Sequence, residues 1–544
     1  MTDTRLTADT ILVNAAIRTM DPLNPEAEAL AIAGGRVLAV GSEAEIRALA
    51  AEGAEVLDAG GRLVLPGFHD THIHLQDGGH HYVESADLTR ADTPELLVDG
   101  MKSFAATHNR PWVFGAFYNS ALLNDKNLSA EVLDRAIPDR PAMVTAADAH
   151  NACINTAAMR ELGLTAETPD PPEGHFVRDA DGNPTGLLYE RAVTWVNNRR
   201  PQPVDEEYRE GVLWAQKHAN EHGITGVLDA LVEERHRRIY AAMAEAGELT
   251  VRVVATALVK PGEPAAEAVA RVSELRAKAQ YDMFRIHSAK FFFDGVVENR
   301  TAAMIEDYSD EIGGNFPVMF PKEEIAELFP AFDAARFQIH VHCIGDGAVR
   351  AALDGMELAR QQNGPWPSRH QIAHIQFIDP ADIPRFAELG VVANVQPLWA
   401  RMEAPVTEAS IPVVGPERSK YIYAFGALTR ARAELVLSSD WTVSTLNPFE
   451  IIETAITRQP GREESNVEPL LPEEALTIEQ CVAGYTILAA HTGWRETETG
   501  SLAPGKLADL IVLDRDIFTC NPKDIGETKV LLTLLGGKAV HGGL

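Results

Sequence analysis

Two histidines spaced two residues apart, His72 and His74, are the residues of this chain best placed to do chemistry. They end the run Leu65–His74, and alternate side chains of a β-strand point to the same face. Two imidazoles would then converge on one point, and imidazole is a common ligand of zinc and other first-row divalent ions. The pair alone also fits an ordinary strand end, so a metal site needs further ligands from elsewhere in the chain.

Four more candidate ligands stand at the ends of apolar, strand-like runs farther along the chain. They are Lys290, His342, His374 and Asp440. In a closed barrel of parallel strands, the carboxyl ends of all strands meet at one rim. We therefore expect these side chains to join His72 and His74 around one or two divalent metal ions. Zinc is the expected ion, with manganese, iron and nickel as alternatives.

Lys290 lies inside the apolar run Ser288–Phe293, and a lysine is costly to bury unless it is paired or neutral. One interpretation is an ion pair with Asp294 or another buried carboxylate. The other is reaction with carbon dioxide, which gives an N6-carboxylated lysine that bridges two metal ions. Burial lowers the pKa of a lysine and frees the neutral amine that this chemistry requires. The spacing of the residues leaves both interpretations open.

Asp440 follows the apolar run Leu435–Ser439. A carboxylate at such a strand end can bind a metal and can also act as a general base. Its alternative role is to cap the next segment. His340 shares a strand face with His342 but lies one layer deeper, so we expect it in the barrel interior rather than among the ligands.

Further residues are candidates for catalysis and substrate binding. His150, a possible stabiliser of an oxyanion, and Asp148 follow the apolar run Ala142–Ala146. A pocket for an apolar substrate uses aromatic side chains and a few polar ones. The candidates near the rim are Tyr118, Phe293, Trp399, Arg401 and Trp441. The aromatic residues among them also fit ordinary packing, and the sequence leaves both roles open.

Strand-like and helical patterns alternate through the centre of the chain, which is typical of a parallel sheet. Eight apolar runs have the length of strands: 63–68, 223–229, 250–255, 285–293, 338–342, 370–375, 391–396 and 435–439. Helical periodicity falls between most of them, for example at 205–221 and 233–246. Eight such units predict an α/β fold with a (β/α)8 barrel, whose active site lies at the carboxyl ends of the strands.

The two ends of the chain carry short strand-like runs that cannot bury a core alone. We expect residues 1–63 and 498–544 to build one composite β-sandwich domain, with two separate β-appendages as the alternative. Residues 64–497 are then the barrel. The stretch 76–222 is too long for an unstructured loop, so we expect a folded insertion on the catalytic face that serves as a lid.

Composition limits the compartment and the partners. With 45% hydrophobic and 23% charged residues, the chain has the composition of a soluble globular protein. A formal net charge of −31 argues against binding to nucleic acid or to an anionic membrane. The four cysteines show no paired spacing, and the first residues do not resemble a secretory signal. We expect a cytoplasmic homodimer that acts on a small molecule.

These motifs resemble the amidohydrolase superfamily, and specifically amidohydrolase family 3, which includes N-substituted formamide deformylases. The resemblance covers nearly the whole chain and rests on Leu65–His74, Lys290 with Asp294-Gly295, His342–Asp346, Arg369–His374, Ser439–Trp441 and Gly500–Leu510. It implies that His72, His74 and Asp440 hold the more buried metal ion. It also implies a bridging, carboxylated Lys290.

By the same resemblance, His342 and His374 hold a second metal ion. Two departures stand out. Ala373 precedes His374 where the family usually has a glutamate, so we expect His374 to be less firmly oriented. The segment after Lys290 is unusually aromatic, which predicts an altered pocket.

The expected reaction is hydrolysis of a C–N bond, in the first place an amide, by a metal-activated water with Asp440 as the general base. Hydrolysis of an ester, a carbamate or a cyclic amide is an alternative. So is metal-dependent decarboxylation or isomerisation on the same barrel, or a metal-binding protein without catalysis. The sequence does not identify the substrate, and we expect specificity to reside in residues 76–222 and 398–420.

Overall fold

The computed structural model describes residues 7–119, 122–146, 151–172, 174–461 and 467–544. The chain divides into two compact units, one of Met1–Leu75 with Ala215–Leu544 and the other of Gln76–Trp214. All six residues that were predicted to bind metal belong to the first unit. None of the helices within these described ranges is both long enough and apolar enough to cross a membrane.

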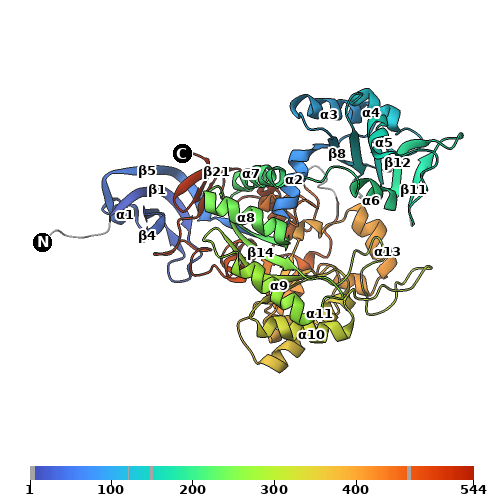
Figure 1. Ribbon diagram of the computed structural model, residues 1–544. Coiled ribbons are helices and arrows are strands. Elements are labelled where there is room, and N and C mark those ends of the chain that lie inside the picture. Colours follow the sequence, from blue (N-terminus) through green and yellow to red (C-terminus); the bar gives the residue numbers. More distant parts are fainter. Residues whose placement is uncertain (1–6, 120–121, 147–150, 173, 462–466) are drawn as a thin grey trace. The chain divides into compact units, whose positions relative to one another are not determined.

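A parallel sheet of eight strands lies at the centre of the first unit (Figure 1). Its strands pair in the order β19-β18-β17-β16-β15-β14-β13-β6, and every neighbouring pair is parallel. The strands are β6 Phe68–Ile73, β13 Ile224–Val232, β14 Arg252–Leu258, β15 Phe284–Phe292, β16 Gln338–Cys343, β17 Gln371–His374, β18 Val392–Val395 and β19 Glu434–Leu437. The predicted α/β fold with an eight-stranded parallel barrel is thereby confirmed.

The barrel closes between its first and last strands, just beyond the end of β19. The N–H of Asp440 donates to the carbonyl oxygen of His72 at 2.8 Å, and the N–H of His74 donates to that of Trp441 at 2.9 Å. The buried carboxylate of Asp70 fastens the same seam, because it accepts from backbone N–H groups on both sides of it at 3.2 Å. Closure therefore brings the predicted ligands of β6 beside Asp440.

The first barrel strand begins later than the sequence indicated. The apolar run 63–68 is divided at Gly67: residues up to Pro66 end strand β5 of another sheet, and β6 starts at Phe68. A Cβ atom at Gly67 would lie 2.3 Å from the hydroxyl oxygen of Thr225, so the chain passes this point only without a side chain. The apolar pattern marked the wrong segment because β6 is rich in polar residues, and barrel closure buries all six of its residues.

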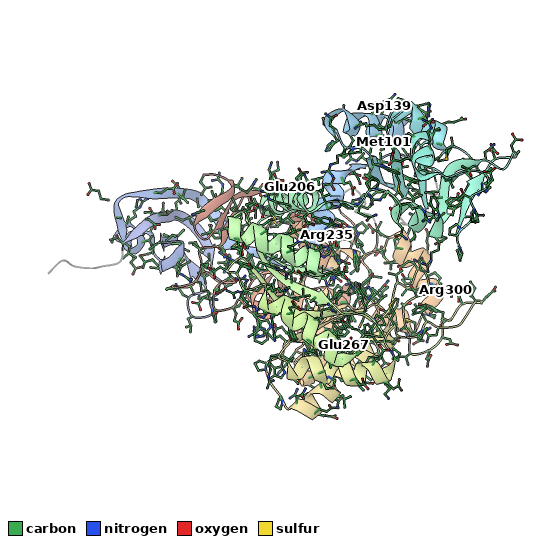
Figure 2. All side chains as sticks on the ribbon, viewed as in Figure 1. Met101, Asp139, Glu206, Arg235, Glu267 and Arg300 are labelled. Carbon is green, nitrogen blue, oxygen red and sulfur yellow. The ribbon has the colours of Figure 1, made fainter. Side chains whose placement is uncertain are left out.

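Helices follow the strands around the outside of the barrel, as α8, α9, α10 and α11 do in green to yellow in Figure 1. The helices after the second unit are α8 Glu234–Ala246, α9 Ala265–Ala277, α10 Lys322–Ala334, α11 Asp346–Asn363, α12 Ile383–Leu389, α13 Ile411–Val414, α14 Phe425–Arg430, α15 Pro448–Thr457, α16 Ile478–Tyr485 and α17 Ile487–Thr492, with short turns η1 Pro397–Trp399, η2 Pro405–Ser410, η3 Arg418–Tyr421, η5 Pro472–Glu474 and η6 Pro522–Glu527. Ala268 and Val272 give α9 a buried face, whereas Glu267 is exposed on its outer face (Figure 2). This amphipathic pattern is what the sequence showed.

Strands from both ends of the chain form a second sheet in the first unit. They pair in the order β22-β21-β20-β5-β1-β3-β4, with β2 paired to β1. The elements are β1 Ala8–Arg18, β2 Glu26–Ala27, β3 Ala29–Ala33, β4 Arg36–Gly41, α1 Glu43–Arg47, β5 Ala50–Pro66, β20 Leu510–Leu513, β21 Val530–Leu535 and β22 Lys538–Gly542. Alternation along β1 places Leu12 in one hydrophobic cluster and Ile11 and Val13 in another, so both faces of the sheet are covered.

A buried ion pair ties this sheet to the barrel. Two nitrogens of Arg252, on β14, lie 2.7 and 2.9 Å from the carboxylate oxygens of Asp509, and the two side chains are 6% and 2% exposed. The same carboxylate accepts the N–H of Gly536 at 2.6 Å. Each charge therefore has its main compensation in the other.

Removing one partner of this pair should destabilise the first unit strongly. We expect Arg252→Met to lower the free energy of unfolding by about 3–5 kcal/mol, because the carboxylate of Asp509 would stay buried without its cation. Chemical denaturation followed by circular dichroism measures the loss. The double variant with Asp509→Leu should recover much of it, since neither charge remains. A single variant as stable as the unsubstituted protein would contradict this assignment.

The second unit, Gln76–Trp214, has a sheet and a core of its own. Its strands pair in the order β11-β12-β10-β9-β8-β7. Between Leu75 and Glu221 the elements are α2 Leu75–Glu84, β7 Ser85–Asp87, α3 Pro94–Thr107, β8 Val113–Tyr118, α4 Ala130–Ala136, β9 Ala142–Ala146, β10 Asn151–Ile154, α5 Thr156–Leu162, β11 Gly174–Arg178, β12 Pro184–Glu190, α6 Arg191–Asn197 and α7 Asp205–Glu221. Met101 on α3, labelled in Figure 2, packs in a hydrophobic cluster with Leu97 and Leu133.

Candidate metal centre

The ends of β6 and β19 bring two imidazoles and a carboxylate together. The Oδ1 atom of Asp440 lies 3.5 Å from Nε2 of His72 and 3.3 Å from Nε2 of His74. The three side chains offer ligand atoms that all lie within 4.8 Å of one another. Nitrogen or oxygen atoms bound to a tetrahedral zinc ion at 2.0–2.1 Å are about 3.3 Å apart. The donor set and its spacing therefore fit a divalent cation.

Three other predicted ligands adjoin this group. The Nζ atom of Lys290 lies 3.4 Å from Nε2 of His72, and the ring centroid of His374 lies 4.9 Å from that of His72. The rings of His342 and His374 are 4.4 Å apart. Oδ2 of Asp440 is 4.0 Å from Nδ1 of His374. The fold thus joins residues that lie hundreds of positions apart in the sequence into one continuous cluster.

Two atoms of the cluster are buried without a hydrogen bond. Within the described ranges, Nε2 of His374 and Oδ1 of Asp440 have no hydrogen-bond partner. Leaving a buried polar atom unsatisfied costs about 1–3 kcal/mol, and more if it is charged. A bound cation would satisfy both atoms, so their presence supports the fit of the donor set to a metal ion.

The imidazoles of His72 and His342 are held through their second ring nitrogen. Nδ1 of His72 shares a hydrogen bond of 2.9 Å with Nε2 of His340, which is fully buried in the barrel as predicted. Nδ1 of His342 lies 3.2 Å from Oδ1 of Asp294. Contacts of this kind orient a histidine ligand and leave its Nε2 available for a metal.

Asp294 is fully engaged and does not pair with Lys290. Besides His342, its carboxylate accepts three backbone N–H groups at 2.8 to 3.0 Å. In the part of the chain that the structure describes, Lys290 forms no ion pair with any carboxylate. The interpretation of Lys290 as the ion-pair partner of Asp294, which the sequence left open, is therefore wrong. The carboxylate of Asp294 is instead hydrogen-bonded to the backbone just after β16.

Burial and charge set the protonation of the centre. Burial lowers the pKa of Lys290 to about 7, although Asp440 acts in the opposite direction. Burial, together with the charge of Lys290, holds the pKa of His72 well below its usual value. Burial alone would raise the pKa of Asp440, but His74, whose Nε2 lies 3.3 Å from Oδ1, and the nearby His374 and Lys290 lower it to about 2. A neutral His72 and an ionised Asp440 are the forms that bind a metal.

Two aromatic rings flank the centre. The ring of Trp399 stacks on that of His374 at a centroid distance of 5.6 Å, as expected for a residue at the rim. Phe292 packs against His342 at 5.3 Å, and its ring centroid lies 4.8 Å from Nζ of Lys290. An apolar group of a substrate would find these two rings beside the ligands.

Phe293 lies elsewhere. It is fully buried, and its ring packs against those of Phe320 and Phe329 at 5.7 and 5.6 Å, between β15 and α10. Successive side chains of a strand point to opposite faces, so Phe292 faces the ligands while Phe293 faces the helix. We therefore correct the expectation that Phe293 lies at the rim, and assign that place to Phe292.

Two further residues that were predicted to contact the substrate, Trp441 and Arg401, make contacts with other side chains of the protein. Trp441 is 2% exposed and its ring lies 6.3 Å from that of His218, which is a packing position. Arg401 forms an ion pair of 2.7 Å with Glu403. Their roles in substrate binding stay predictions.

Three predicted residues belong to the insertion. Tyr118 is fully buried in a hydrophobic cluster of the second unit. Asp148 and His150, including the proposed oxyanion contact of His150, lie outside the residues that the structure describes. Their roles also stay predictions.

Gln396 is the residue at the centre that the sequence analysis missed. Its Oε1 atom lies 2.8 Å from Nδ1 of His374. The residue ends the apolar run 391–396, immediately after β18, which pairs with the strand of His374. A polar side chain at the end of a strand next to a ligand strand was a signal that could have found it.

Comparison with known proteins agrees with this geometry. The chain belongs to the amidohydrolase family, whose sequence model matches residues 55–541. It is 29% identical to an N-substituted formamide deformylase of Arthrobacter pascens over 97% of each chain, and 28% identical to the Arabidopsis thaliana protein LONG AFTER FAR-RED 3 over 98% of this chain and 92% of that one.

A solved structure is similar as well. An uncharacterised metal-dependent hydrolase of Pyrococcus furiosus is 26% identical and superposes with a TM-score of 0.76 over 94% of this chain and all of that one. The predicted family is confirmed. The chain is a metal-dependent hydrolase that acts on carbon–nitrogen bonds.

Proposed function

We propose that this protein hydrolyses the C–N bond of a small amide, with N-substituted formamides as the first class to examine. The observation that carries the proposal is the group of His72, His74 and Asp440, whose ligand atoms lie within 4.8 Å of one another, with the carboxylate oxygen 3.5 and 3.3 Å from the two imidazole nitrogens. The similarity to a formamide deformylase over nearly the whole chain supports the choice of substrate class.

The chain's own residues would divide the chemistry between them. A divalent ion bound here would polarise the substrate carbonyl and make a water molecule more acidic. His72 and His74 would hold the ion, and Asp440 would accept a proton from the attacking water. The water oxygen forms the new C–O bond. Asp440 then returns the proton to the amine nitrogen as the C–N bond breaks, which balances the reaction.

We also propose that Lys290 is N6-carboxylated and would help to hold two ions, one with His72, His74 and Asp440 and the other with His342 and His374. Support comes from the position of its amine, fully buried beside His72 and without a carboxylate partner among the described residues. The neutral amine adds to carbon dioxide and loses one proton. The resulting carbamate gives the cluster a negative charge that a pair of divalent ions would balance.

The finer domain boundaries are part of the same proposal. We infer that residues 1–63 and 498–544 act as one β-domain, to which β5 adds residues as far as Pro66, and that the catalytic barrel lies within residues 64–497. The two hydrophobic clusters of the second sheet support the first assignment. Residues 76–222 remain our candidate for the segment that sets substrate specificity.

A substrate panel tests the proposal most broadly. Protein loaded with zinc, and a chelator-treated sample, would be assayed against N-substituted formamides, other amides, cyclic amides, carbamates and esters. We expect amide hydrolysis only in the loaded sample, recovered when metal is returned, because the ion is needed to activate water. Carboxylate release from esters alone, or carbon dioxide release without water uptake, would refute the proposed substrate class.

A further inference from the structure

A chain of neutral polar side chains runs through the interior of the barrel and ends at His374. Its members are Gln338, Gln371, Asn394, Ser438 and Gln396, each at most 1% exposed. Buried polar groups are normally hydrogen-bonded, and here each group is bonded to the next one. An amide has separate donor and acceptor atoms, and a hydroxyl has a single hydrogen to donate, so such a chain has a direction.

Backbone carbonyl groups set the direction at the end far from His374. Gln338 donates from Nε2 to the carbonyl oxygens of Arg369 and Thr492, the latter at 3.1 Å. A carbonyl oxygen can only accept, so the amide of Gln338 cannot turn around without losing both bonds. Its Oε1 is left to accept from Nε2 of Gln371 at 3.2 Å.

Asn394 provides a second and independent anchor. Its Nδ2 donates to the carbonyl oxygen of Thr71 at 2.9 Å and to Oε1 of Gln371 at 2.8 Å. Its Oδ1 accepts the hydroxyl of Ser438 at 2.7 Å. Because this bond uses the single hydrogen of Ser438, the hydroxyl oxygen must accept from the next group. It accepts from Nε2 of Gln396 at 2.7 Å.

The direction of the chain decides the tautomer of His374. With Nε2 of Gln396 used, its Oε1 faces Nδ1 of His374 at 2.8 Å, and an amide oxygen can only accept. Nδ1 must therefore carry the proton, and Nε2 keeps a free lone pair. That Nε2 is the buried atom for which the described residues offer no hydrogen-bond partner.

We propose that Gln396 is a positioning residue that fixes His374 in the tautomer required for metal binding, and that the four other side chains hold Gln396 in turn. The proposal rests on the proposed role of His374 as a metal ligand. It corrects the expectation that Ala373 leaves His374 poorly oriented, because the acceptor comes from the neighbouring strand instead. An amide orients the ring without adding the negative charge that Asp294 adds at His342.

Matched substitutions at Gln396 separate hydrogen bonding from packing. Gln396→Met keeps the length of the side chain but removes the acceptor, whereas Gln396→Glu keeps an acceptor for His374. We expect the methionine variant to bind zinc roughly 10- to 100-fold more weakly in chelator competition, since loss of such a partner has that typical effect. The glutamate variant should lose less affinity than the methionine variant, because it keeps an acceptor for His374 although it loses the donor to Ser438.

The control is Gln376→Met, which removes a buried amide bonded to Ser410 and not to a histidine. It should leave zinc affinity unchanged. Equal affinity of Gln396→Met and the unsubstituted protein would overturn the proposal, as would an equal loss in the control.

A second measurement does not depend on whether the variants of Gln396 fold. Nitrogen-15 spectra of the full, metal-free chain labelled at histidine distinguish a protonated from an unprotonated ring nitrogen, and His374→Ala identifies the signals. We expect a protonated Nδ1 and an unprotonated Nε2 at His374, and the reverse would overturn the proposal. The zinc content of His374→Ala tests the proposed metal role separately, because the tautomer is read without metal.

Discussion

Replacing Asp440 by asparagine should reduce turnover of an amide substrate by roughly 1,000-fold or more while the fold stays intact. The substitution keeps the shape of the side chain but removes the charge that lies 3.3 and 3.5 Å from the two imidazoles. Loss of a general base alone typically costs 10²- to 10⁴-fold in rate. Steady-state kinetics measure the effect, with circular dichroism to show that the protein is folded.

A matched control comes from the outside of the barrel. Asp354 on α11 is 59% exposed and pairs with Arg385 at 2.8 Å. Exposed ion pairs contribute little to stability, so Asp354→Asn should keep full activity. An Asp440→Asn variant that retains more than a tenth of the original rate would show that Asp440 is not the base.

The second large effect is expected at Lys290. Lys290→Met fills the same buried space without an amine, so it can be neither charged nor carboxylated. We expect roughly a 100-fold or greater loss of turnover and a lower metal content, because the proposed bridge between the ions is gone. Carbon-13 spectra of protein kept under labelled carbon dioxide should show one carbamate signal that is absent from the variant.

Lys260 provides the control for that substitution. It is 66% exposed and lies 2.7 Å from Glu233, so its charge is in contact with solvent and needs no buried partner. Lys260→Met should retain both activity and metal content. If Lys290→Met is as active as this control, then Lys290 is a packing residue and the second ion has no bridge.

Much of the barrel was predictable from periodicity because most of its elements have regular patterns. The expected strand 338–342 and the expected helix 205–221 match β16 and α7 closely. The first barrel strand did not follow the pattern. Its polar residues are buried by closure against β19, and a sequence pattern cannot show burial that arises from a partner some 370 residues away.

The residues of the candidate site were likewise predictable only in part from the sequence. Histidine, lysine and aspartate at strand ends are unusual residue types in buried places, so they stand out in the sequence. Gln396 does not, because an amide has no charge and its role depends on which atom of His374 it meets. The assignment of Phe293 in place of Phe292 was an error of one residue, since the end of β15 sets which ring faces inward.

The most direct test of the account is to locate the metal itself. Crystals of zinc-loaded protein, measured at the zinc absorption edge, would give an anomalous signal at the position of each ion. We predict a peak within about 2.0–2.2 Å of ligand atoms of His72, His74 and Asp440. A fully loaded crystal with no peak among these side chains, or with peaks only elsewhere on the molecule, would contradict it.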